Sequence, residues 1–284
     1  TATCSVTVRT SPTSVSVSGT DPVYVKVGGT KAITATVAPS TANYNNGITW
    51  TSNQTGYATV SGGTVTGKVA TTTSMTDVAI TATTGNSKSA TRKVRVTQLS
   101  GGNTQYVKAG GTVTLTPTKS AHAGTINWTT SNSTNAKLSA TSGNSVTVTA
   151  GSTAGSYTVT ATEANGGSAT SYTIIVATFG ISPGSAVLDM SGTKTQQLTP
   201  SGSNYGSVTY TSSNTGVATV SASGLITGIA NGTATITARS STTGATAACS
   251  VTVRTSPASV SVSGSDPVYV KVGGTKALSA TVAP

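Results

Sequence analysis

The sequence predicts an all-β fold, organised as tandem antiparallel β-sandwiches that follow one another in a beaded rod. Short runs alternate Val or Ile with Thr or Ser, as in 23–27, and Gly or Asn residues separate these runs. Roughly one residue in five is Thr, which favours a pleated, half-exposed strand. No stretch combines the Ala, Leu, Glu and Lys content of a helix with a period of about 3.6 residues.

The two ends of the chain carry nearly the same sequence. Residues 1–39 and 246–284 differ at five of 39 pairs, and Cys4 recurs as Cys249, an offset of 249 − 4 = 245 residues. A repeat at a fixed spacing is typical of an array of structural units. We therefore expect a window from a longer periodic array, holding one full period of three diverged domains and a short overlap.

Turn signals and short linkers divide the window into five parts. The expected parts are the last strand of a preceding domain (1–9), a first complete domain (10–97), a diverged second (98–177), a third (178–254), and the first strands of a following domain (255–284). The linkers lack the Gly/Ser or Pro-rich composition of a flexible tether, so neighbouring domains should abut. In donor-strand exchange, strand 1–9 of one copy would complete the domain that begins at 255–284 of another copy. We do not favour this arrangement, because the two pieces together lack the middle strands of a domain.

Within each complete domain the strand signals recur in the same order. In the first domain, alternating runs at 15–17, 23–27 and 33–37 precede G-I-T-W at 47–50, and T-T-G-N-S-K at 83–88 predicts a hairpin turn. In the second domain, Q-Y-V-K-A-G-G-T at 105–112 and T-I-N-W at 125–128 repeat this order, with a later turn at 165–167. The third domain starts with A-V-L-D at 186–189 and continues in the same way.

The chain is basic, with 16 Lys and Arg against five Asp and Glu and a net charge of +11. The positive net charge reflects a shortage of acids more than a concentration of bases, since most of the bases are scattered along the sequence. The one dense group contains Lys88, Arg92, Lys93 and Arg95. It is a candidate patch for an anionic polymer. It has no interleaved aromatic residues for base stacking, so we expect no nucleic-acid partner.

The two cysteines occupy the same position of the repeat. Cys4 shares strand parity with Val6 and Val8, which places its sulfur on the inward face of a strand. We therefore expect Cys4 and Cys249 to be buried free thiols that behave as small apolar residues. They lie three domains apart, which excludes a disulfide between them.

The third domain contains a specific series of motifs: V-T-Y-T-S-S-N at 208–214, V-A-T-V at 217–220, G-L-I-T-G at 224–228 and G-T-A-T-I-T-A at 232–238. This series resembles the bacterial Ig-like domain, group 2. The first domain matches it at several positions between Ile48 and Gly67. The second keeps Trp128 and Asn132 but has Lys137-Leu138 where V-A-T-V is expected. The resemblance implies Ig-like β-sandwiches used as spacers or stalks in prokaryotic surface proteins or phage tails, with no catalytic residues.

Three aromatic residues, Trp50, Trp128 and Tyr210, occupy one position of the three domains. We expect them to be central core anchors of the sandwiches. A sugar-binding aromatic is the alternative interpretation of the same position.

The residues needed for catalysis or metal binding are sparse. His122 is the single histidine, and the five acids are spread along the chain without metal-ligand spacing. A single histidine also leaves no confident nucleophile–base pair. Glu163 and Asp189 are the acids considered for a Lys–Asn isopeptide crosslink, and their places near a turn and a strand end disfavour it. We expect no enzyme activity, no cofactor and no metal.

These observations lead to one functional hypothesis and one alternative. We expect a structural repeat segment of a long extracellular filament or surface fibre, prokaryotic or from a phage virion, that self-associates through Thr/Ser-rich sandwich surfaces. The partners are then neighbouring repeats or parallel chains, with cell-surface glycans or an anionic polymer as further candidates. The alternative is a passive stalk of an adhesin or phage tail fibre with a binding head outside the window. No apolar run in the sequence is long enough to span a membrane.

Overall fold

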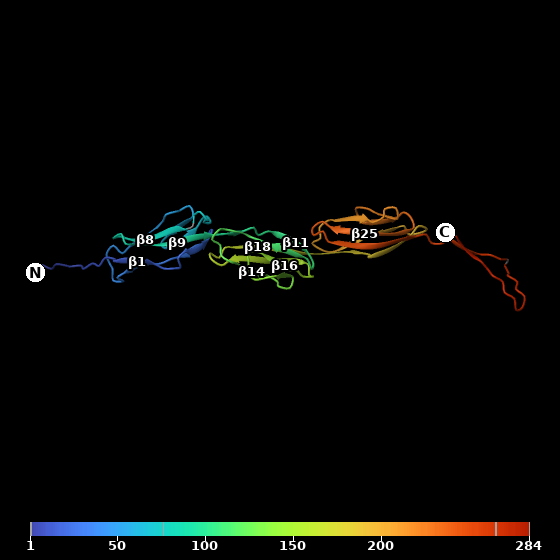
Figure 1. Ribbon diagram of the computed structural model, residues 1–284, viewed down its shortest axis with the longest axis horizontal. Coiled ribbons are helices and arrows are strands. Elements are labelled where there is room, and N and C mark those ends of the chain that lie inside the picture. The colour runs from blue at the N-terminus through green and yellow to red at the C-terminus, as the bar shows by residue number, and fades with distance from the viewer. Residues whose placement is uncertain (1, 76, 265, 284) are drawn as a thin grey trace. The chain divides into compact units, whose positions relative to one another are not determined.

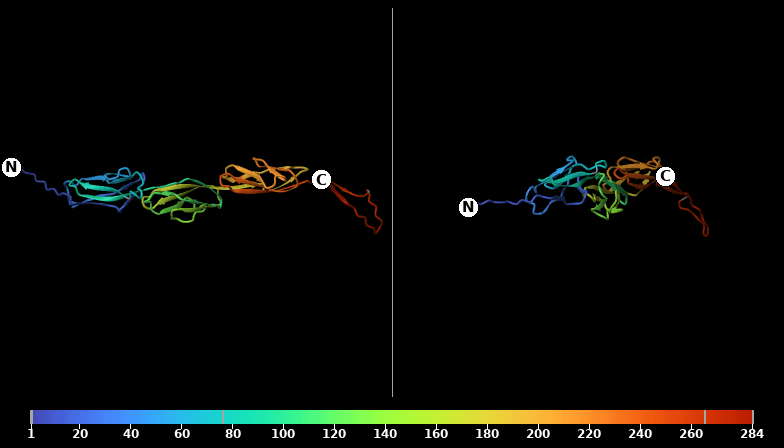
Figure 2. Two further views of the ribbon diagram at one scale, coloured as in Figure 1. Left: turned by 45° about the horizontal axis from the view of Figure 1, so that its top comes forward. Right: turned by 60° about the vertical axis from the view of Figure 1, so that its left-hand side comes forward.

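The computed structural model describes residues 2–75, 77–264 and 266–283. All the regular secondary structure in this part of the chain is β-strand. The chain divides into two compact units: residues 1–105, 111–151 and 156–174, and residues 106–110, 152–155 and 175–284. The strands gather into three sandwiches, each seen as a separate bundle of arrows in Figures 1 and 2. The first unit holds the first sandwich and most of the second, and the second unit holds the third.

The first sandwich consists of β1 (Ser14–Val17), β2 (Val23–Lys26), β3 (Thr30–Ala32), β4 (Ala35–Ala38), β5 (Ile48–Ser52), β6 (Ala58–Ser61), β7 (Thr64–Gly67), β8 (Val78–Thr84) and β9 (Ser89–Thr97). A four-stranded sheet of order β2-β9-β8-β5 faces a three-stranded sheet of order β3-β7-β6, and β1 pairs with β4. The pairing of β2 with β9 is parallel, and the other named strand pairs are antiparallel.

The period of two in the sequence explains how this sandwich closes. Along β8, Val78, Ile80 and Ala82 are fully buried, while the Thr and Ala residues between them are half-buried. Successive strand residues point to opposite faces, so one face of β8 belongs to the core. The predicted hairpin turn joins β8 to β9, with Ser87 at a φ of 67°. An amide-to-carbonyl bond of 2.8 Å from Thr84 to Lys88 closes this turn.

The second sandwich consists of β10 (Leu99–Ser100), β11 (Thr104–Lys108), β12 (Thr112–Leu115), β13 (Thr118–Lys119), β14 (Ile126–Thr130), β15 (Ala136–Leu138), β16 (Val146–Ala150), β17 (Gly155–Glu163) and β18 (Ala169–Ser182). Its sheets have the orders β11-β18-β17-β14 and β12-β16-β15, with β10 paired to β13. Trp128 and Tyr172 pack in its interior with ring centroids 6.2 Å apart. β18 continues through Ala177 and Thr178, where the sequence predicted a linker.

The third sandwich consists of β19 (Ser185–Asp189), β20 (Thr195–Gln197), β21 (Thr199–Ser203), β22 (Val208–Ser212), β23 (Ala218–Val220), β24 (Leu225–Gly228), β25 (Gly232–Ser240) and β26 (Thr246–Arg254). Its sheets have the orders β19-β26-β25-β22 and β20-β24-β23, and β21 pairs with residues 178–182 of β18. The pairing of β19 with β26 is parallel, as for β2 and β9 in the first sandwich. The core includes Ile226, Ile236 and Val251.

The repeated sequence gives the same local pairing twice. β27 (Ser259–Val262) pairs with β28 (Ala280–Ala283) so that Ser259 lies opposite Ala283, and β1 pairs with β4 so that Ser14 lies opposite Ala38. Both members of each pair are offset by 245 residues, since 259 − 14 = 245 and 283 − 38 = 245. The register of this pair is therefore set by its own residues.

The structure corrects one prediction about the thiols. Cys249 is fully buried on β26, as expected, but Cys4 is exposed. Cys249 belongs to the buried core of the third sandwich, together with Ala218 of β23 and Ile226 of β24 in the sheet that faces β26. Residues 2–10 form no strand in the described part of the chain, so the same residue type at the same repeat position has no core to enter.

Candidate functional site

The three aromatic residues at the shared position differ in burial. Trp128 is 2% exposed, whereas Trp50 and Tyr210 are only partly buried against the cores of the first and third sandwiches. Each lies on an edge strand of the larger sheet of its sandwich: Trp50 on β5, Trp128 on β14 and Tyr210 on β22. What covers that sheet edge therefore decides whether the aromatic side chain is a full core residue.

In the second sandwich the chain covers this edge itself. Seven residues, 139–145, separate β15 from β16, and residues 141–143 run along the outer edge of β14. The amide of Trp128 donates to the carbonyl of Thr141 at 2.8 Å, and the amide of Gly143 donates to the carbonyl of Ile126 at 3.0 Å. The indole Nε1 of Trp128 donates to the carbonyl of Gly143 at 2.8 Å. We call residues 141–143 the edge cover.

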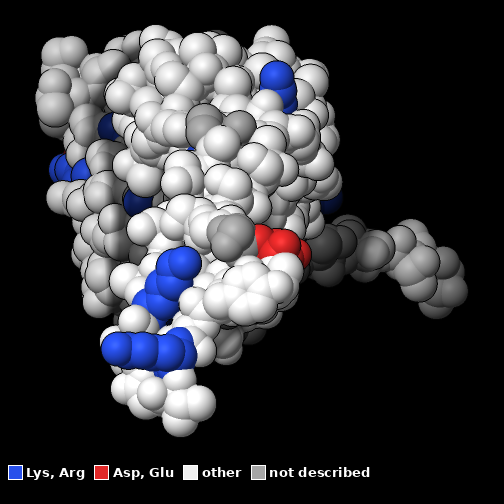
Figure 3. Space-filling model, turned by 90° about the vertical axis from the view of Figure 1, so that its right-hand side faces the viewer, with Lys and Arg blue, Asp and Glu red and all other residues white. Residues whose placement is uncertain are grey.

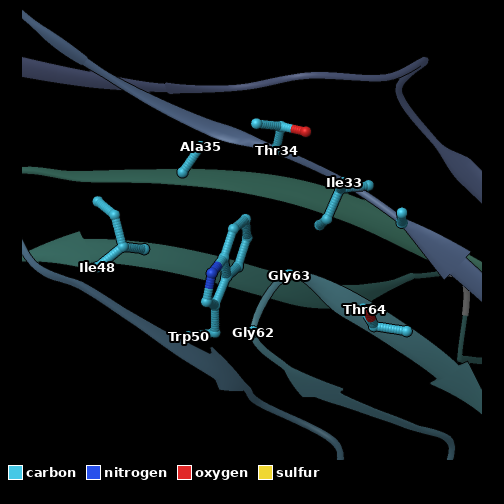
Figure 4. A pocket seen from close by; sticks show the side chains of 9 residues that line it. Ile33, Thr34, Ala35, Ile48, Trp50, Gly62, Gly63 and Thr64 are labelled. Carbon is cyan, nitrogen blue, oxygen red and sulfur yellow. The ribbon is translucent and has the colours of Figure 1, made fainter.

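The first sandwich has no such cover. Only residues 62–63 separate β6 from β7, and both glycines have positive φ, 54° and 81°. This tight turn ends before it reaches the outer edge of β5. A hollow of about 350 Å³ is left beside Trp50. Figure 4 shows the indole ring standing in this hollow, with Ile33 and Ile48 on either side of it.

The third sandwich resembles the first at this position. Four residues, 221–224, separate β23 from β24. Gly224 has a φ of 84°, and a Cβ atom there would lie 2.9 Å from Cζ of Tyr210, so the turn packs on the tyrosine ring. Within the described residues no strand or bridge pairs with the outer edge of β22 or of β5. We call these two strand edges the open edges.

A second notable group is a buried carboxylate where the first two sandwiches meet inside the first unit. Glu163 ends β17 and is 1% exposed. Its Oε1 accepts bonds from the Thr97 hydroxyl at 2.6 Å and from the amides of Gly166 and Ser168 at 2.7 and 3.2 Å. Its Oε2 accepts bonds from the amides of Gly124 and Asn165 at 3.0 and 2.9 Å.

Because Thr97 ends β9 of the first sandwich, this carboxylate joins the two sandwiches. Burial acts to raise the pKa of Glu163, but the Thr97 hydroxyl and the backbone amides outweigh it and lower the pKa below the ordinary value. Sequence reasoning noted Glu163 only as a residue near a turn. The usable signal was the turn itself, because an acid two residues before Asn165 is placed to accept bonds from the amides of the turn, here those of Asn165, Gly166 and Ser168.

The predicted basic patch is divided by its own strand. Lys88 lies in the hairpin turn, while Arg92 lies on the same side of β9 as the core residue Val94. Lys93 and Arg95 point to the other face, where both contact Asp77 at 3.5 and 2.7 Å. Burial acts to raise the pKa of Asp77, and Arg95 and Lys93 outweigh it and lower the pKa. Alternation along the strand thus separates these bases, and one acid neutralises part of their charge.

Charged side chains are sparse elsewhere as well. On the face shown in Figure 3 most of the surface carries neither a base nor an acid. Among residues 2–75, 77–264 and 266–283, no cluster of three or more His, Cys, Asp or Glu is arranged to hold a metal ion. The same residues include no helix with the length and apolar character of a membrane span. The Nε2 atom of His122 lies 3.1 Å from the carbonyl oxygen of Thr72.

The topology of the sandwiches defines the class of the protein first: an all-β chain of tandem Ig-like domains. Residues 175–251 match the family model of the bacterial Ig-like domain (group 2). This match confirms the resemblance found in the motifs at 208–238 of the third domain. Domains of this family are typical of surface proteins, and the fold is typical of structural and adhesion proteins.

Three solved structures illustrate the similarity to Ig-like proteins. The C-terminal 282-residue fragment of intimin, in complex with the intimin-binding domain of the translocated intimin receptor, is 23% identical with a TM-score of 0.43. The match covers 55% of this chain and 62% of that fragment, so the chain spans under two thirds of its length. An I-band fragment of titin is 13% identical over 83% of this chain and 95% of the fragment, with a TM-score of 0.33.

The N-terminal four Ig domains of a Dscam1 isoform are 14% identical over 86% of this chain and 73% of that chain, with a TM-score of 0.30. A comparison with curated protein sequences gives no match.

Proposed function

We propose that this chain is a structural repeat segment of a long extracellular filament or surface fibre of a prokaryote, and that copies associate through their Thr- and Ser-rich sandwich surfaces. The repeat at an offset of 245 residues carries this proposal, because both its sequence and its strand register recur. A repeat kept this similar beside diverged neighbouring domains is expected of an array that uses one unit many times. The family match at residues 175–251 is consistent with a surface location.

The outer faces of the strands suit contact between copies. Threonine hydroxyls pair across strands on these faces, as Thr81 with Thr91 at 2.9 Å and Thr114 with Thr147 at 3.3 Å. Away from Lys93 and Arg95 on β9, these faces carry few charges that would repel a neighbouring copy, and hydroxyl groups form hydrogen bonds with protein or glycan surfaces alike. Surfaces of this kind support lateral packing between parallel chains.

The strand order of the first and third sandwiches suits a load along the chain. In the first, the early strand β2 and the last strand β9 are parallel neighbours, with Val23 opposite Val94. β19 and β26 repeat this arrangement in the third. A pull on the two chain ends slides such strands past each other, so the ladder bonds are loaded together rather than one after another. The sandwiches then resist extension as whole units.

Electron microscopy of the native material tests this proposal. We expect several chains packed side by side, with an axial repeat that corresponds to three domains. Single thin strands that end in a distinct globular head would contradict it, and would instead support the passive stalk of an adhesin or phage tail fibre.

A further inference from the structure

We propose that the open edges, the outer edges of β5 and β22, are the sites at which a second copy of this chain docks by antiparallel strand pairing through its own open edge. This inference rests on the proposed function, because it names the surface through which copies associate. It follows from a comparison of three versions of one sheet edge within a single chain: one covered and two uncovered.

The covered edge shows what the position binds. In the second sandwich, the edge cover supplies a carbonyl to the Trp128 amide, an amide to the Ile126 carbonyl and a second carbonyl to the Trp128 indole. All three partners are backbone groups of a short segment that bridges β14 at Ser142. The edge therefore accepts backbone groups from another segment, and the second sandwich supplies them from its own chain.

The uncovered edges present the same backbone groups. The amide of Asn53 donates to Ala79 in the first sandwich, and the amide of Ser131 donates to Thr158 in the second. Because inward and outward bonding alternate along an antiparallel strand, Ile48 and Trp50 direct their backbone groups outward, as Ile126 and Trp128 do. Among the described residues, no atom accepts a hydrogen bond from the Trp50 indole.

The third sandwich keeps this alternation. The amide of Ser213 donates to the carbonyl of Thr235, which directs the backbone groups of Val208 and Tyr210 outward. The hollow of about 350 Å³ lies beside Trp50, whereas the indole of Trp128 at the same motif position is bonded to Gly143 of the edge cover. The first and third sandwiches thus offer one kind of docking edge twice in each period.

The chemistry of the open edges favours a second copy as the occupant. Exposed strand edges are usually protected against pairing by Lys, Pro or bulges. β5 reads I-T-W-T-S and β22 reads V-T-Y-T-S, and neither contains a charge or a proline. Each chain has a net charge of +11, so contact between two copies is least opposed where the local surface carries no base. The open edges are such places, and each is self-complementary in an antiparallel pair.

Edge variants of the full chain test this proposal. Thr49, Thr51, Thr209 and Thr211 have exposed side chains on the open edges. Lysine at all four positions places like charges where two edges meet, and we expect the assemblies seen by sedimentation velocity and electron microscopy to fall at least ten-fold in amount. The matched control is Asn127→Lys with Thr129→Lys on β14, whose edge is already covered, and it should assemble like the wild type.

A second measurement follows the first open edge directly. In a Trp128→Phe chain, Trp50 is the single tryptophan, and we expect its emission to shift to shorter wavelength on assembly because the docked strand excludes water from the hollow. Circular dichroism establishes that each variant is folded.

The outcomes separate the two proposals. Unchanged assembly of the four-lysine variant, equal loss in the β14 control, or an unshifted Trp50 emission in assembled chains would overturn docking at the open edges while the filament proposal stands. A wild-type chain that stays monomeric at every concentration, together with native material made of single strands, would overturn both.

Discussion

Replacing Glu163 by glutamine tests whether the buried carboxylate holds the first two sandwiches together. The substitution keeps the shape of the side chain but turns one acceptor oxygen into an NH₂ donor. If the NH₂ takes the place of Oε2, the amides of Gly124 and Asn165 lose their acceptor. If it takes the place of Oε1, three donors lose theirs.

A buried donor without a partner costs about 1–3 kcal/mol, so two of them predict a loss of roughly 2–6 kcal/mol in the free energy of unfolding. Urea unfolding followed by tryptophan fluorescence measures this loss, because both tryptophans, Trp50 and Trp128, lie in the first two sandwiches. The control is Thr97→Val, which removes one donor and leaves four bonds to the carboxylate. It should cost less than Glu163→Gln, since the remaining donors keep their acceptor.

The pH dependence supplies the refuting result. The pKa of Glu163 is lowered in the folded protein, so the unfolded chain binds the proton more tightly. The stabilisation is therefore fully present above the ordinary value of 4.5 and is lost as pH falls through the lowered value of the folded state. The difference between wild type and Glu163→Gln should shrink at acid pH. A loss below about 1 kcal/mol, or a difference that does not change with pH, would refute the argument.

Three further predictions concern the core, the thiols and the surface charges. Ile236→Ala, in the core of the third sandwich, should lower the free energy of unfolding by about 2–5 kcal/mol, and Ile236→Val by about 0.5–1.5 kcal/mol; calorimetry that shows equal effects would contradict the assigned packing. A thiol reagent followed by mass spectrometry should label Cys4 rapidly and Cys249 only on unfolding, since burial also raises the pKa of the Cys249 thiol; equal labelling rates would count against this. Asp77→Asn should change the free energy of unfolding by only about 0–1 kcal/mol, because Lys93 is exposed and Asp77 and Arg95 are partly open to solvent; a larger thermal shift would mean that Arg95 depends on this acid.

The sequence by itself determined the strands, their inward faces and the family of the third domain. These properties depend on neighbours in the chain: alternation places Val78 and Ile80 on one face, and the residues of β1 and β4 set a register that the distant repeat reproduces. Alternation and local strand register depend on residues that are close in the sequence, so they can be predicted without a structure.

Burial was decided by the tertiary structure, because it requires partners from elsewhere in the chain. Val23 and Val25 are each 2% exposed in the first sandwich, while their repeat equivalents Val268 and Val270 are 37% and 50% exposed beside β27 and β28. Near-identical residues differ because β9 packs against the first pair, and no described strand packs against the second. The same cause exposes Cys4 while Cys249 is buried.

The candidate sites depend on loop length and on junctions between sandwiches, which strand patterns do not encode. Seven residues between β15 and β16 cover the edge of β14, and two residues between β6 and β7 leave the edge of β5 open. The motif at Trp50 and Trp128 is the same in both domains, so it predicted the same core role for both. The surrounding backbone decides which of them is fully enclosed, because only a segment long enough to reach the sheet edge can pair with it.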